Sequence, residues 1–194
     1  LTASGVVKLQ GDKNATLTLD TLTLDNAQAN ISAKADIKNL TLNNTKETAI
    51  GENVSITTLN LNQSNANLKL LNGQIPKTIN LNTQSNLYLN ELNLNTNSIT
   101  LTSDETSKAH IKNLIYDATN AQTNGTKTAP QSNLIVSEKF ELKNVGQNLG
   151  TTQGTQNTPS AEKEKLEKDL FTLKFDKNLE LKDGAKLDIS FAEA

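Results

Sequence analysis

Few residues of this chain could act chemically on a ligand, and His110 comes first because it is the sole histidine. Imidazole and thiolate groups are the usual protein ligands of transition metals, and the chain contains no cysteine. Asp104 and Glu105 lie close to His110 in sequence, in a segment that reads as a turn. We therefore interpret His110 as a surface residue and predict no catalytic site, no metal site and no cofactor.

Paired carboxylates are the second chemistry to consider, because glycoside hydrolysis needs two of them on either side of the scissile bond. The candidates are Asp20, Asp25, Asp36, Glu52 and Glu91. They occupy different offsets in the repeat described below, so the sequence does not predict that any two converge. The chain also has no arginine, which excludes the Asp/Arg arrangement of pectate-lyase-like enzymes. A carbohydrate-active enzyme is thus an alternative that the pattern does not favour.

Asparagine could carry a covalent modification. Seven positions begin an Asn-x-Ser/Thr acceptor sequence, and they are Asn14, Asn30, Asn39, Asn43, Asn53, Asn62 and Asn124. Asn14 alone also has an acidic residue two positions earlier, Asp12, which is the longer acceptor form used by some bacteria. Asn14 is therefore the candidate glycosylation site.

Composition limits the class of protein. The 194 residues are 35% hydrophobic and 3% aromatic, with 27 asparagines, no cysteine and a formal net charge of −2. No disulfide framework is possible, and the nearly neutral charge predicts no nucleic-acid partner. No apolar run approaches the 18 residues or more of a membrane-spanning helix, so we predict no membrane insertion by this segment.

A recurring hexamer is the main signal in the sequence. Its pattern is apolar, polar, polar, Leu, polar, Leu, with some variation. It occurs as LDTLTL at Leu19–Leu24, IKNLTL at Ile37–Leu42, ITTLNL at Ile56–Leu61, PKTINL at Pro76–Leu81, LNELNL at Leu89–Leu94 and IKNLIY at Ile111–Tyr116. The fourth positions are spaced by 18, 19, 20, 13 and 22 residues. The interval of 13 indicates that one copy is out of phase or lies on a different face.

Alternation of apolar and polar residues predicts short strands with one buried side. A second alternating element follows several hexamers, as at Ala66–Leu70, and Asn, Asp, Ser and Gly separate the elements. Strands that recur about every 19 residues indicate a parallel β-solenoid, in which each coil buries its apolar side only by stacking on the next. The outward residue between the two leucines of the hexamer would then form a hydrogen-bonding ladder along the stack. Its members are Thr23, Thr41, Asn60, Asn80 and Asn93.

The pattern changes after residue 116. We predict β-helix coils over residues 1–116, a loop excursion over 117–133 and a strand returning to the solenoid over 134–145. Residues 146–170 are predicted to hold a mobile loop and one short helix, Ala161–Leu170. Residues 171–194 alternate again and are predicted to form terminal strands or a cap.

The hexamer, its spacing and the phrase LTLDNAQANISAKADIKNLTLNN resemble passenger domains of bacterial autotransporters, of the vacuolating-cytotoxin or haemagglutinin-type adhesin kind. The resemblance covers residues 15–116. It implies an all-β fold, a right-handed parallel β-helix, and a location outside the cell or on the bacterial surface. It carries no catalytic motif.

The expected function is therefore that of a non-catalytic passenger segment acting in adhesion or toxin-type host interaction. The expected partner is a host cell-surface protein or glycan, or copies of the chain itself. Binding would be mediated by loops displayed on a rigid stalk, at Asp117–Asn133 and Gly146–Ser160. The alternative within the same architecture is a filament or surface-layer subunit that assembles through the ends of the solenoid.

Overall fold

The chain folds entirely into β-structure over the residues that the computed structural model describes, which are 1–69, 75–95, 99–121, 125–146 and 171–192. No helix occurs in these residues, and the predicted helix Ala161–Leu170 lies outside them. The strands are β1 Thr2–Leu9, β2 Leu17–Ile31, β3 Ala35–Asn43, β4 Glu47–Ile50, β5 Val54–Asn62, β6 Asn65–Leu68, β7 Thr78–Asn82, β8 Asn86–Asn93, β9 Thr100–Ser103, β10 Lys108–Asp117, β11 Thr126–Thr128, β12 Leu134–Val145, β13 Thr172–Lys174, β14 Leu179–Leu181 and β15 Lys186–Phe191.

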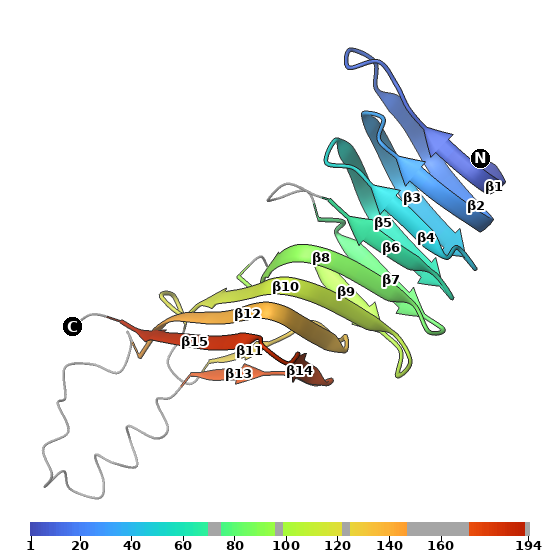
Figure 1. Ribbon diagram of the computed structural model, residues 1–194. Coiled ribbons are helices and arrows are strands. Elements are labelled where there is room, and N and C mark those ends of the chain that lie inside the picture. Colours follow the sequence, from blue (N-terminus) through green and yellow to red (C-terminus); the bar gives the residue numbers. More distant parts are fainter. Residues whose placement is uncertain (70–74, 96–98, 122–124, 147–170, 193–194) are drawn as a thin grey trace, which may run out of the picture.

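All strand pairs among the described residues are parallel, and the chain winds through about six turns of a β-solenoid. Successive coils stack from β1 at one end to β15 at the other (Figure 1). The prediction of an all-β parallel solenoid is confirmed.

Three walls surround the interior. The first wall contains Leu17–Asp25 of β2, then β3, β5, β7 and β9. The second wall contains Gln28–Ile31 of β2, then β4, β6, the first halves of β8, β10 and β12, and β14. The third wall contains the second halves of β8, β10 and β12, followed by β15. Because the long strand β2 belongs to two walls, it joins their ladders into one continuous 13-stranded sheet.

The register explains the irregular interval of 13 residues. Leu22, Leu40, Leu59 and Ile79 stack in the first wall, and the next residue in that column is Leu101. Leu92 and Leu114 stack on each other in the third wall instead. The hexamer at Leu89–Leu94 therefore lies on a different face, which was one of the two interpretations of the spacing.

Aliphatic columns fill the interior between the walls. Leu22, Leu40, Leu59 and Ile79 are all 0% exposed, as are the residues two positions further along the same strands, Leu24, Leu42, Leu61 and Leu81. Burying a side chain of this size contributes about 1.5–3 kcal/mol. Each side chain reaches this burial only because the coils above and below cover it, so the stability of a coil depends on its neighbours.

The turn from the first wall to the second requires a left-handed backbone. Asn26 has φ 49° and Asn44 has φ 46°, and the same turn in the next coils is made by Gln63 at 51°, Thr83 at 53° and Gln84 at 55°. Asparagine tolerates this region better than most residues, which explains its use in the first two coils. The Asn44 Nδ2 group donates to Asn26 Oδ1 at 2.5 Å, so these side chains also bond from coil to coil.

A column of buried hydroxyl groups follows that turn. Its members are Thr45, Ser64, Ser85 and Ser107, each no more than 1% exposed. The backbone N–H of Thr45 donates to Ser64 Oγ at 3.0 Å, that of Ser64 to Ser85 Oγ at 3.1 Å, and that of Ser85 to Ser107 Oγ at 3.0 Å. The hydroxyl groups thus supply the acceptors that the strand ladder does not provide where the chain turns.

Residues 117–133 differ from the predicted loop excursion. They contain β11, which pairs with β13, and Gln131 forms a bridge with Thr102 at the edge of the first wall. Ala118, Ala121 and Ala129 are buried. Part of this segment therefore packs against the solenoid. The sequence did not indicate this, because the small apolar residues alternate with polar ones over only a short span.

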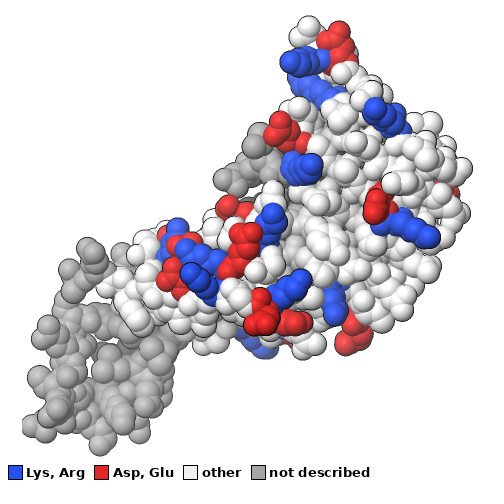
Figure 2. All heavy atoms as spheres, viewed as in Figure 1, with Lys and Arg blue, Asp and Glu red and all other residues white. Residues whose placement is uncertain are grey.

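Charged side chains of both signs are mixed over the face seen in Figure 2. The visible face has no continuous area of one charge. Among the described residues, no helix has the length and apolar character needed to cross a membrane.

Candidate binding groove

One column of outward-facing side chains crosses the second wall. Strand register places Asn67 of β6 beside Tyr88 of β8, Tyr88 beside His110 of β10, and His110 beside Ile135 of β12. The side chains point outward because their neighbours on either side, such as Leu87 and Leu89, fill the interior. Four coils therefore contribute one residue each to the same line.

Tyr88 and His110 are held face to face. Their ring centroids are 4.4 Å apart and their planes differ by 13°. Asn86 Nδ2 donates to Asn65 Oδ1 at 3.0 Å, which directs Asn86 Oδ1 to the His110 Nε2 atom at 2.9 Å. An amide oxygen can only accept, so His110 Nε2 carries the proton in this arrangement. The stack on Tyr88 and the hydrogen bond with Asn86 together hold the ring of His110 in position.

A second outward column lies beside the first, and each coil contributes to it the residue that follows its second-wall segment. Its members are Lys69, Asn90, Lys112, Ser137 and Lys182. Backbone hydrogen bonds continue the ladder to this position, since Lys69 N donates to Ile50 O at 2.9 Å and Lys182 N to Val136 O at 2.8 Å. The two columns and Glu52 line a groove of about 570 Å³.

The residues that line the groove have a more positive net charge than the chain as a whole. Three lysines and one glutamate line it, whereas the whole chain has a net charge of −2. None of the three lysines forms an ion pair with a described residue. Burial, then the nearby Lys108 and Lys182, lower the pKa of His110, and Glu180 opposes this shift only in part. His110 is therefore neutral at pH 7, and the lysines supply the positive charge.

The Thr/Asn ladder lies on the first wall, away from the groove. The structure aligns Thr23, Thr41, Asn60 and Asn80 in consecutive coils. Asn60 Nδ2 donates to Thr41 Oγ1 at 3.4 Å and Asn80 Nδ2 to Asn60 Oδ1 at 2.8 Å. Asn93 does not belong to this column, because it pairs with Ile115 in the third wall, and Thr102 takes the expected place.

A second ladder on the first wall was not anticipated. Asn43 Nδ2 donates to Asp25 Oδ1 at 2.7 Å, Asn62 Nδ2 to Asn43 Oδ1 at 2.8 Å, and Asn82 Nδ2 to Asn62 Oδ1 at 3.3 Å. Asp25 is therefore bound within a structural ladder. This explains why asparagine follows the hexamer in the three coils after Asp25, at Asn43, Asn62 and Asn82.

Asn14 lies in an exposed turn between β1 and β2. Its backbone N–H donates to Asp12 Oδ1 at 3.1 Å, so the acidic residue of the acceptor sequence helps to shape the turn. The side chain of Asn14 is accessible at this position, and its modification stays a prediction.

The candidate carboxylates do not gather in one place. Asp20 is exposed and lies 3.9 Å from Lys38, and Glu52 is the only one of the five that lines the groove. Asp104 instead stabilises two turns, accepting from Thr83 N in the preceding coil at 2.7 Å and from Thr106 N in its own turn at 3.1 Å. In the part of the chain that the structure describes, no three His, Cys, Asp or Glu residues are placed to hold a metal ion.

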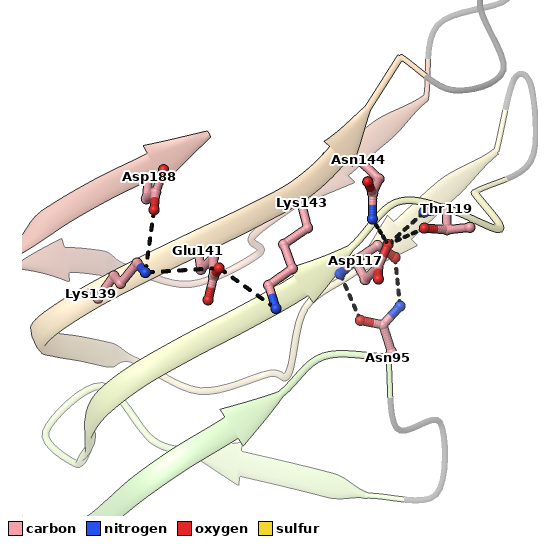
Figure 3. A network of polar contacts seen from close by, with 8 residues as sticks. All are labelled: Asn95, Asp117, Thr119, Lys139, Glu141, Lys143, Asn144 and Asp188. Atoms are coloured by element: carbon pink, nitrogen blue, oxygen red, sulfur yellow. Dashed lines mark hydrogen bonds and ion pairs between the residues drawn. The ribbon is translucent and has the colours of Figure 1, made fainter. Parts of the chain in front are cut away.

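Asp117 organises a separate polar network at the end of the third wall (Figure 3). Its carboxylate accepts from Thr119 N at 2.9 Å and Asn144 Nδ2 at 3.0 Å, while its backbone N–H donates to Asn95 Oδ1 at 2.7 Å. The hydrogen bonds from Thr119 and then Asn144 lower the pKa of Asp117. Asn95 and Asn144 join Asp117 to the coils on either side, and Thr119 closes the turn that contains Asp117, so this network is structural.

No protein-family model, curated protein or solved structure matches this chain significantly. Sequence reasoning missed the groove, although one signal was present: lysine follows the second-wall strand in alternate coils, at Lys69, Lys112 and Lys182. That signal becomes visible only when the strands are aligned in register.

Proposed function

We propose that this chain is a non-catalytic passenger segment of a bacterial surface or secreted protein, which acts outside the cell in adhesion or toxin-type host interaction. The observation that carries the proposal is the continuous parallel solenoid, whose walls present ordered columns of polar side chains. A stack of coils joined by backbone hydrogen bonds is a rigid support, and surfaces on it keep a fixed spacing. The partner is a host cell-surface protein or glycan.

The binding surface in this proposal includes the side of the solenoid as well as its loops. Residues 117–133 contain β11 and buried alanines, so they form only a limited projection. Of the segment Gly146–Ser160, only Gly146 is among the described residues. The groove of the second wall therefore adds to the loops as a candidate contact surface.

Binding to cultured epithelial cells tests this function. The labelled 194-residue chain is added to cells and measured by flow cytometry, with unlabelled chain as competitor and a heat-unfolded sample as the control. Saturable binding that the folded competitor displaces is the expected result. Binding that does not saturate, or that the unfolded sample reproduces, would overturn the proposal.

Assembly through the solenoid ends is the second candidate, and β15 favours it. Leu187, Ile189 and Phe191 are 54%, 44% and 73% exposed although they continue the inward columns of the third wall. An apolar end strand of this kind leaves a free edge that can pair with a strand at the end of a second copy. Sedimentation velocity is the test. A mass that rises with concentration, and falls to the monomer in Leu187→Lys/Phe191→Lys, would support a filament subunit, whereas a monomer at all concentrations would exclude it.

A further inference from the structure

We propose that the groove of the second wall binds an acidic polysaccharide in which a carboxylated sugar alternates with a neutral one, lying along the solenoid axis. The proposal rests on the proposed function and deepens it, since it assigns the chemical class of the ligand and the surface that receives it.

The spacing of the lysines is the first argument. Lys69, Lys112 and Lys182 stand on alternate coils, and Asn90 and Ser137 occupy the coils between them. Neighbouring strands are about 4.8 Å apart, so successive lysines are attached about 10 Å apart along the axis. One disaccharide of an extended polysaccharide covers a comparable length. A carboxylate on every second sugar would then meet a lysine, and the neutral sugars would face the amide of Asn90 and the hydroxyl of Ser137.

The neighbouring column supplies the contacts that sugars need besides charge. Tyr88 is 42% exposed and stacks on His110, so the pair offers a fixed aromatic edge beside the lysines. Aromatic rings pack against the apolar C–H surface of a sugar, and amides such as Asn67 bond its hydroxyl groups. The ring pair needs no ordering on binding because a hydrogen bond from His110 to Asn86 already fixes it.

The charge of the groove is the third argument, because it suits a ligand of low charge density. Glu52 lines the groove with the three lysines, and Glu180 follows Ile135 at the end of the adjacent column. These carboxylates repel a chain that carries several acid groups on each disaccharide. A polysaccharide with one acid group per disaccharide matches the alternate lysines and leaves Glu52, one coil before Lys69, opposite a neutral sugar. Glu180 shares the coil of Lys182 and reduces the positive charge there, which further disfavours a densely charged ligand.

Calorimetric titration of the full chain with short hyaluronan oligosaccharides tests the proposal, with chitin oligosaccharides as the neutral probe and heparin oligosaccharides of equal length as the densely charged one. The groove variant is Lys69→Gln/Lys112→Gln/Lys182→Gln. The matched control is Lys34→Gln/Lys46→Gln/Lys77→Gln, which removes the same charge at exposed positions outside the groove. Circular dichroism verifies that both variants fold.

Hyaluronan is expected to bind and chitin is not. The groove variant should bind hyaluronan about tenfold more weakly, because it loses three exposed charge contacts of modest strength. The control variant should change affinity less than about twofold. Equal weakening in both variants, tighter binding of heparin through the same lysines, or no binding of hyaluronan would each overturn the proposal.

Cell binding by the same variants separates the two proposals. If the groove variant binds cells as the wild type does and also keeps its affinity for hyaluronan, the groove proposal fails while adhesion stands. If the wild type binds hyaluronan through the groove but binds no cells, the groove proposal stands and the proposed function fails.

Discussion

Removing the hydroxyl group of Ser85 tests whether the buried polar column holds neighbouring coils together. The Ser85 Oγ atom accepts from the backbone N–H of Ser64 at 3.1 Å and donates to the carbonyl oxygen of Asn82 at 2.6 Å. Ser85 is 0% and Ser64 1% exposed, so water does not reach either group. In Ser85→Ala the Ser64 N–H would have no acceptor.

The expected loss follows from the cost of a buried donor without a partner. That cost is about 1–3 kcal/mol, and we expect Ser85→Ala to lower the free energy of unfolding by about 2 kcal/mol. For a chain of this length the corresponding decrease in Tm is about 4–8 °C. Ser85→Thr should stay close to the wild type, because Thr45 occupies the same position in another coil. Ser55→Ala, at an exposed site on β5, should change stability by less than about 0.5 kcal/mol.

Urea unfolding monitored by circular dichroism gives the free-energy differences, and amide hydrogen exchange gives the local effect. The Ser64 amide should exchange faster in Ser85→Ala, while the Leu61 amide in the preceding strand keeps its protection. If Ser85→Ala is as stable as the wild type and the Ser64 amide stays protected, the column does not contribute as argued.

Three further predictions follow from the described geometry. Gln63 has φ 51°, so Gln63→Gly should raise the free energy of unfolding by about 0.5–1 kcal/mol in urea titration; a decrease would contradict the strain argument. Leu59 is 0% exposed, so Leu59→Ala should cost about 3–4 kcal/mol in the same assay, and the exposed Leu17→Ala far less; equal costs would refute the assigned burial. Burial raises the pKa of Asp104, but hydrogen bonds from Thr83, Ser107 and Thr106 lower it to about 2. Its contribution to stability should therefore be complete above pH 3.8 and decline as the pH falls through about 2; a carboxyl titration near 3.8 by NMR would oppose this.

The repeat made the solenoid predictable because inward leucines and outward Thr or Asn alternate with period two. Thr23, Thr41, Asn60 and Asn80 could be aligned from the hexamer alone, since the intervals of 18 to 20 residues follow one wall. Asn93 was misplaced because LNELNL has the same pattern on another wall. Alternation shows which side of a strand is buried, but it does not show which wall the strand joins.

The remaining features depend on how the strands of neighbouring coils are aligned, and the sequence alone does not show this alignment. Ser64 and Ser85 look like ordinary turn residues, and their burial follows only from stacked coils. The left-handed turn at Gln63 was not predicted, because glutamine gives no signal for it. The groove combines residues spaced by one or more coils, such as Lys69 and Lys112, so no local motif marks it.

The orientation of the backbone hydrogen bonds determines how this chain responds to mechanical force. Every parallel pair bonds one coil to the next, so these bonds point along the solenoid axis. A pull on the chain ends along that axis peels the end coil away first, so its bonds separate one after another instead of resisting together. Each coil of about 19 residues that peels away releases roughly 65 Å of extended chain in exchange for about 4.8 Å of stacked length. Under axial tension the molecule therefore lengthens in small steps and absorbs work as it does so, while the coils that remain keep their surfaces intact.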